Sequence, residues 1–233
     1  KTLLVDATEK YLPYDVIPAR CLNGQGLVIS KTRHGWMEIS PKAKAKTIVN
    51  AQLKLNEEGQ LNGKITYARE GYDAQVMRES YNKAGESSYV EAYTKSKQWQ
   101  VAKSEFQDVA DVNKQVKEIH EVSIAEHTSS GGDVIYLNPF ITAQMEENPF
   151  KSETRMYPVD YGSQQESVYL MQLTIPDGFV VDEMPQPKIF SMPGNAARYL
   201  YSATQIGNVI NFNSTFQVNK NTFSQAEYPI LRE

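Results

Sequence analysis

The chain has 233 residues, of which 40% are hydrophobic and 22% are charged, and this composition excludes a disordered protein. The 24 lysines and arginines against 28 aspartates and glutamates give a net charge of −4, which excludes nucleic acid as a partner because a phosphate backbone requires clustered cations. No apolar run approaches the roughly 20 residues that span a bilayer, and Cys21, the only cysteine, cannot form an internal disulfide.

The first 46 residues are expected to contain one short strand and then an irregular connector. Thr-Leu-Leu-Val at residues 2–5 is typical of a strand, whereas residues 12–46 contain Pro13, Pro18 and Pro41 and little strand character. The chain starts at Lys1 without an initiator methionine or a signal-peptide pattern. We therefore expect it to be a fragment of a longer protein.

A β-hairpin and a helical insertion are predicted next. Apolar and polar residues alternate over 47–55 and again over 61–69, with a glycine-containing turn between the two runs. Residues 72–83 favour a helix that ends at Gly85, and the S-x-x-E spacing of Ser88 and Glu91 predicts the start of a second helix that ends near residue 98.

Strands dominate the rest of the predicted fold. They are expected over residues 99–106, 116–125, 134–137, 168–175, 179–181, 188–192, 198–203 and 209–216. Turns rich in proline, glycine and asparagine separate them. The fold class is therefore mainly β, a jelly-roll-like β-sandwich with a short helical insertion, and residues 47–233 are assigned to this domain with helices near 72–98.

Catalytic and metal-binding constellations are weak in this sequence. Cys21 could act as a nucleophile only with a histidine in reach, and His34, His120 and His127 are the candidates. On a strand over residues 117–127, the odd separation of His120 and His127 would place them on opposite faces, so they could not share a metal ion. We predict no metal site and no cofactor, and we predict that the chain by itself is not an enzyme.

Aromatic residues offer a second class of function, which is carbohydrate binding. The chain holds 14 tyrosines, 8 phenylalanines and 2 tryptophans. An exposed aromatic ring can stack on a sugar because it presents apolar area beside polar groups. Trp36 and Trp99 are the candidate residues, although most such aromatic residues simply occupy half-buried positions in a sheet.

Two segments resemble a known family. Leu-Val-Asp-Ala-Thr at residues 4–8 and Arg-Cys-Leu-Asn-Gly at residues 20–24 resemble the junction that follows the catalytic core in exported transglutaminase-like proteins of Gram-negative bacteria. Residues 132–140 and 155–159 resemble the C-terminal β domain of unknown function in the same family. The resemblance implies that residues 1–46 are the end of the transglutaminase-like core and a connector.

In that family, a Cys-His-Asp triad performs the chemistry, and the aspartate orients the histidine. Asp6 matches the position of that acid, while the family's cysteine and histidine would lie upstream of Lys1. The resemblance thus implies a non-catalytic accessory domain of a periplasmic or extracellular protein, partnered by its own upstream core and, through that core, by a protein or glycan substrate. It also predicts an exposed apolar patch near Leu3, Tyr11 and Tyr14, where the core would dock.

Overall fold

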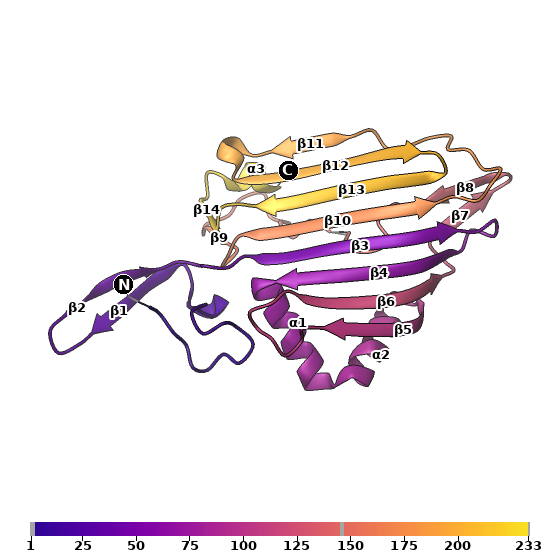
Figure 1. Cartoon of the computed structure of the whole chain (residues 1–233). Coiled ribbons are helices and arrows are strands. Elements are labelled where there is room, and N and C mark those ends of the chain that lie inside the picture. The colour runs from indigo at the N-terminus through magenta and orange to yellow at the C-terminus, as the bar shows by residue number, and fades with distance from the viewer. Residues whose placement is uncertain (1–2, 145–146, 233) are drawn as a thin grey trace.

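Most of the chain is built on one large β-sheet, as the computed structural model shows (Figure 1). The structure describes residues 3–144 and 147–232. In chain order the elements are η1 (Ala19–Cys21), β1 (Gly24–Ile29), β2 (His34–Ile39), β3 (Ala45–Leu55), β4 (Leu61–Glu70), α1 (Gly71–Ala84), α2 (Glu86–Lys97), β5 (Gln100–Gln107), β6 (Val116–Ile124), β7 (Thr128–Gly131), β8 (Val134–Leu137), β9 (Val159–Asp160), β10 (Gln165–Thr174), β11 (Lys188–Ser191), η2 (Pro193–Asn195), β12 (Ala197–Ile206), β13 (Val209–Val218), β14 (Thr222–Phe223) and α3 (Tyr228–Arg232).

The large sheet has eight strands in the order β11-β12-β13-β10-β3-β4-β6-β5. Its neighbouring strands are antiparallel except for β10 and β3, which run parallel with Gln165 opposite Ala45. This parallel pair joins the N-terminal half of the sheet to the C-terminal half. The pairs β1–β2, β7–β8 and β9–β14 form separate two-stranded sheets.

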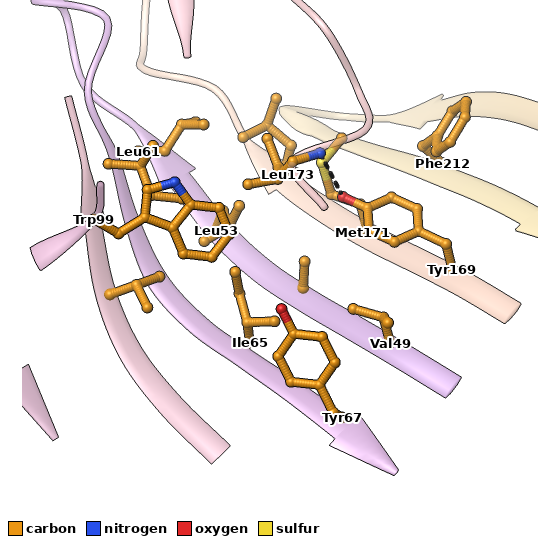
Figure 2. Close-up of a cluster of buried hydrophobic side chains, with 14 of the residues drawn as sticks. Val49, Leu53, Leu61, Ile65, Tyr67, Trp99, Tyr169, Met171, Leu173 and Phe212 are labelled. Atoms are coloured by element: carbon orange, nitrogen blue, oxygen red, sulfur yellow. Dashed lines mark hydrogen bonds between the residues drawn. The ribbon is translucent and has the colours of Figure 1, made fainter. Parts of the chain in front are cut away.

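One face of the large sheet is apolar and carries the main core (Figure 2). Alternate residues of a strand point to opposite faces, so the period-two pattern separates buried from exposed side chains. The buried face carries Val49, Ala51, Leu53, Leu61, Ile65, Tyr67, Val122, Ile124, Tyr169, Met171, Leu173 and Phe212. The other face carries polar side chains such as Gln52, Lys64, Glu121 and Gln172 and is open to solvent. Each large aliphatic side chain that is buried contributes about 1.5–3 kcal/mol to stability.

The two helices follow β4 and lie beside the β4–β6–β5 part of the sheet (Figure 1). Helix α1 packs Ala74 and Met77 against Val116 of β6. Gly85 separates α1 from α2 with a φ of 76°, as the sequence predicted. The predicted capping box is wrong, because α2 begins at Glu86 and Ser88 lies inside the helix.

The mainly-β prediction is confirmed, and the large sheet is consistent with a β-sandwich. The layer that covers the apolar face consists of Tyr93 of α2, Trp99, residues 137–141 and residues 179–181. Residues 179–181 were predicted to form a strand but are not part of one, although their side chains still pack on the core. In the described part of the chain, no helix is long and apolar enough to cross a membrane.

Two predictions for the N-terminal 46 residues need correction. Residues 3–5 do not form the expected strand, and Thr2 lies outside the described residues. The expected connector contains a regular β-hairpin, β1–β2, which projects away from the large sheet (Figure 1). Its strands pair around a turn at residues 30–33, in which Ser30 Oγ accepts a hydrogen bond from the Arg33 backbone N–H at 2.9 Å.

Candidate functional site

The N-terminal segment, residues 3–23, is attached to helix α1. Leu12, Ala45 and Tyr72 form a small buried cluster. The Tyr72 hydroxyl donates a hydrogen bond to the Ile17 carbonyl oxygen at 2.8 Å. Burial raises the pKa of Tyr72 to about 12, so the hydroxyl remains a donor over the whole physiological range. Helix α1 therefore determines where the N-terminal segment lies.

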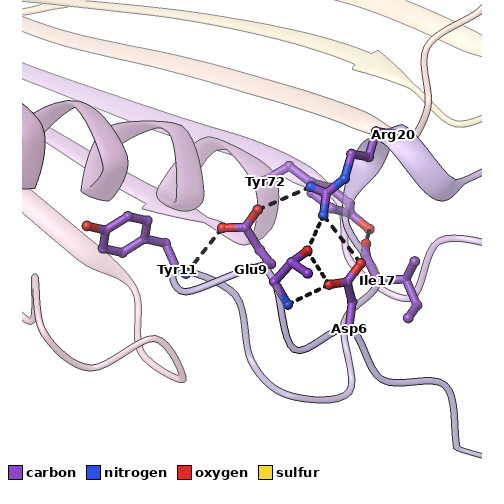
Figure 3. A network of polar contacts seen from close by, with 7 residues as sticks. Asp6, Glu9, Tyr11, Ile17, Arg20 and Tyr72 are labelled. Atoms are coloured by element: carbon purple, nitrogen blue, oxygen red, sulfur yellow. Dashed lines mark hydrogen bonds and ion pairs between the residues drawn. The ribbon is translucent and has the colours of Figure 1, made fainter.

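Asp6 is held by a local network of polar contacts (Figure 3). Its Oδ1 accepts hydrogen bonds from the backbone N–H of Thr8 at 2.8 Å and from Thr8 Oγ1 at 2.5 Å. Arg20 Nη2 lies 3.3 Å from Asp6 Oδ2 and donates to Thr8 Oγ1 at 2.7 Å, while Arg20 Nη1 lies 3.5 Å from Glu9 Oε2. The Thr8 hydroxyl, then the Thr8 backbone N–H and the Arg20 charge, lower the pKa of Asp6, which favours the carboxylate.

The structure does not bring a nucleophile and a base together in this region. Cys21 is a partly buried free thiol, and none of its hydrogen bonds in the described residues joins it to a histidine. His34 lies at the start of β2, and His127 Nε2 is 2.9 Å from the Asn138 carbonyl oxygen. Asp6 itself contacts Thr8 and Arg20. In this chain the Asp6 network orders the N-terminal segment.

The β1–β2 hairpin carries an exposed apolar face, which we call the hairpin face and define as Leu27, Ile29 and Trp36. These side chains are 52%, 78% and 67% exposed. They share one face because Leu27 pairs with Trp36 and Ile29 lies two residues further along β1. From the sequence, only Trp36 was expected to be exposed here. The short apolar runs Leu27-Val28-Ile29 and Trp36-Met37 on either side of residues 30–33 were the signal that could have revealed Leu27 and Ile29.

Exposed apolar side chains also occur in the N-terminal segment, where the docking hypothesis expected them. Leu3 is 49% exposed and Tyr14 is 73% exposed, and Val5 adds a third exposed apolar side chain. Tyr11, the other residue expected there, is only partly exposed. A single two-stranded hairpin is marginally stable in water without a surface to pack against. The hairpin face and these three side chains are therefore the candidate functional site.

Trp99 does not belong to an exposed aromatic surface. It is 8% exposed, lies in the main core and makes an edge-to-face contact with Tyr93 at 6.1 Å between ring centroids. This corrects the expectation that Trp99 could stack on a sugar. Trp36 and Trp99 therefore do not form one aromatic platform, and Trp36 contributes instead to the hairpin face.

A buried polar cluster lies between the sheet and α2, and it includes His120. The Tyr93 ring stacks on the His120 ring at 4.2 Å between centroids, and Ser104 Oγ is 2.8 Å from His120 Nδ1. Glu118 forms an ion pair with Arg69 and accepts a hydrogen bond from Tyr89 at 2.9 Å. His120 and Glu118 are 0% and 1% exposed, so a substrate cannot reach them. The cluster holds α2 on the sheet.

The described residues contain no group of three or more histidine, cysteine, aspartate or glutamate side chains that could hold a metal ion. Strand β6 ends at Ile124, close to the predicted end at residue 125, so His120 and His127 do not lie on one strand. His120 points into the core with Glu118 and Val122, which are also buried.

Acid is expected to weaken the fold through His120. Burial, followed by the charge of Arg69, lowers the pKa of His120 from 6.5 to about 4. Between these pH values the unfolded chain binds a proton that the folded chain does not. The free energy of unfolding should therefore fall as the pH falls from about 6.5 to about 4, by roughly 2–3 kcal/mol from this group. Urea unfolding at several pH values measures the slope.

The matched variant for this experiment is His120→Gln. It retains a polar side chain beside Ser104 but cannot titrate, whereas the exposed carboxylates titrate equally in both proteins. Between pH 6.5 and 4.5 the free energy of unfolding should change less steeply with pH in the variant. Equal slopes in the two proteins would contradict the assignment to His120.

The fold and the site together define a mainly-β domain with one large one-sided sheet and a projecting apolar hairpin. Residues 133–233, less than half of the chain, match a family model described as "Domain of Unknown Function with solved-structure structure (DUF3858)". Comparison with curated proteins gave no match. Comparison with solved structures also gave none. The matched region begins just before β8, and its strand β10 pairs with β3 outside it.

Proposed function

We propose that this chain is a non-catalytic accessory domain that docks onto the transglutaminase-like core of an exported, periplasmic or extracellular protein. The observation that carries the proposal is the hairpin face, whose three apolar side chains stand on a two-stranded arm away from the large sheet (Figure 1). Contiguous exposed apolar residues of this kind mark contact surfaces. The motif at residues 4–8 that resembles the transglutaminase-like family lies in the adjoining N-terminal segment. For this reason we propose the core as the partner that covers the hairpin face.

The N-terminal segment gives the docking surface a fixed position. Tyr72 and Leu12 tie the segment to α1, and Asn23, at the base of the hairpin, donates a hydrogen bond from its side chain to Asp160 at 2.6 Å and to the Gly162 carbonyl at 2.8 Å. A surface that is held in place loses less conformational freedom when it binds. On this proposal, residues 1–46 are the end of the core and its connector and carry Asp6 as the acid of the triad, the core supplies the cysteine and histidine, and residues 47–233 take no part in the chemistry.

The first test is to read the residues encoded upstream of Lys1. The proposal requires a transglutaminase-like core there, with its cysteine and histidine. A coding sequence that lacks such a core overturns it.

The second test compares the 233-residue chain with the longer polypeptide that contains the core. Backbone amides of residues 24–39 are expected to exchange with deuterium about tenfold or more slowly in the longer protein, because docking would protect the hairpin. The Leu27→Ser, Trp36→Ser double variant should lose this protection. Ile206→Ser is the matched control, because Ile206 is 73% exposed but lies on β12. Equal exchange of the hairpin in both proteins would refute docking.

A further inference from the structure

A large groove lies where the apolar face of the sheet is only partly covered. Its volume is about 1340 Å³. Beneath it lie Met171 and Leu173 of β10 and Phe212 of β13, all of which are at most 2% exposed and are drawn in Figure 2. Strand β8 and residues 179–185 form its walls. The apolar floor that a ligand can reach is formed by the partly exposed Tyr201 and Ala203 of β12 and Ile210 of β13, which pack against these buried side chains.

The lip of the groove adds exposed apolar area. Tyr136 of β8 is 62% exposed, and Val180 in the opposite wall segment is 87% exposed. Val180 follows Phe179, which packs onto the main core and anchors this wall. An apolar floor combined with exposed apolar lips favours an occupant with several apolar groups.

The charges around the groove have one sign. Four exposed carboxylates line it, Glu126 and Asp133 near the β7–β8 hairpin and Asp182 and Glu183 in the residue 179–185 wall. Among the described residues, no lysine or arginine lines the groove. An occupant with cationic groups on both sides of an apolar stretch would complement this distribution of charge.

The size of the groove indicates a polymer rather than a small molecule. Pockets for small molecules and cofactors have volumes of about 300–1000 Å³, and this groove is larger. We propose that it binds a peptide segment of a protein partner, with apolar side chains on the Tyr201, Ala203 and Ile210 floor and lysine or arginine beside the rim carboxylates. This site is separate from the hairpin face and does not depend on the docking of a core.

The test uses two fluorescein-labelled peptides of about ten residues, each with the same central run of leucine and valine. One carries lysines at both ends and the other carries glutamates. Fluorescence anisotropy with the full chain should show binding of the lysine peptide that weakens as salt is added, and binding of the glutamate peptide should be about tenfold weaker or absent. No binding of the lysine peptide, or equal binding of both peptides, overturns the proposal.

Two variants locate the binding site. The double variant Asp182→Asn, Glu183→Gln should weaken binding of the lysine peptide about fivefold or more through loss of two ion pairs. The matched control is Glu79→Gln with Glu153→Gln, which removes two exposed carboxylates outside the groove. It should leave the affinity for the lysine peptide unchanged. Val180→Glu places a charge on the apolar lip at a position that is already exposed, and it should also weaken binding.

The outcomes of these experiments separate the alternatives. If the affinity for the lysine peptide is unchanged in both the Asp182→Asn, Glu183→Gln variant and Val180→Glu, the peptide does not bind in the groove and the proposal is wrong. Dodecylammonium is an apolar cation without a peptide backbone; if it saturates the groove and the lysine peptide does not bind, the peptide assignment is wrong. Leu27→Ser with Trp36→Ser should leave peptide binding unchanged, so failure of the docking proposal and failure of this one are distinguishable.

Discussion

Replacement of Arg78 by methionine is expected to lower the free energy of unfolding by about 3 kcal/mol or more. Arg78 lies on α1, is 1% exposed and donates to four backbone carbonyls of the β5–β6 connection. The acceptors are the carbonyl oxygens of Val109 at 3.1 Å, Asp108 at 3.2 Å, Asp111 at 2.8 Å and Lys114 at 2.8 Å. Methionine keeps most of the apolar stem but leaves these acceptors without their donor.

Urea unfolding followed by circular dichroism measures the change in the free energy of unfolding. Lys114→Met is the control, because its ammonium group forms exposed ion pairs with Asp108 and Asp111, and it should cost less than about 1 kcal/mol. Residues 108–114 should also lose hydrogen-exchange protection in Arg78→Met. A change similar to that of the control would show that the buried guanidinium does not hold this connection.

Replacement of Gly71 by alanine is expected to lower the free energy of unfolding by about 2–4 kcal/mol. Gly71 joins β4 to α1 with a φ of 57°, and a Cβ atom there would lie 1.9 Å from the Lys44 carbonyl oxygen. That oxygen also accepts the Tyr72 backbone N–H at 3.1 Å, so the backbone cannot move away without loss of this hydrogen bond. Alanine would therefore have to adopt an unfavourable left-handed conformation, and its Cβ atom would also collide with the backbone.

Gly194→Ala is the matched control, because Gly194 has the left-handed values φ 64° and ψ 15° but a Cβ atom there would meet only open space. In this control the free energy of unfolding should fall only by the cost of the left-handed conformation, about 1–2 kcal/mol. Because Tyr72 binds the N-terminal segment, Gly71→Ala should also make residues 3–23 more sensitive to limited proteolysis. Equal stability of the two variants would argue against the collision with Lys44.

Local features of the fold were predictable because they depend on short-range patterns. Alternation predicted β3 and β4, and strand-forming residues predicted β5 and β6, to within a few residues, while Gly85 marked the end of α1. The prediction for Ser88 failed because a capping-box spacing also occurs inside helices, where Gly85 already provides the boundary.

The arrangement of the sheet could not be predicted, because it depends on contacts between residues far apart in the sequence. Nothing in the pattern of β3 or β10 specifies that they pair in parallel. The same reason explains Trp99, whose burial depends on Tyr93 of α2. For His120 a local signal did exist: Val116, Glu118, His120, Val122 and Ile124 alternate on one face of β6, and three of the five are aliphatic.

The candidate site was predicted in part. Exposed apolar residues were expected near Leu3 and Tyr14, and they are present. The hairpin face was missed because residues 12–46 were interpreted from their prolines, although the three prolines lie outside β1 and β2. The groove was missed because its walls come from β8 and residues 179–185, which meet only in three dimensions.

The parallel pairing of β3 and β10 has a consequence for synthesis of the protein. Strands β3 to β6 leave the ribosome well before β10 does, so β3 has one hydrogen-bonding edge without its partner during that interval. An edge of 11 residues with apolar side chains can template aggregation until β10 arrives. Because that closure joins distant parts of the chain, folding should be slow, and a chaperone that shields β3 would raise the yield.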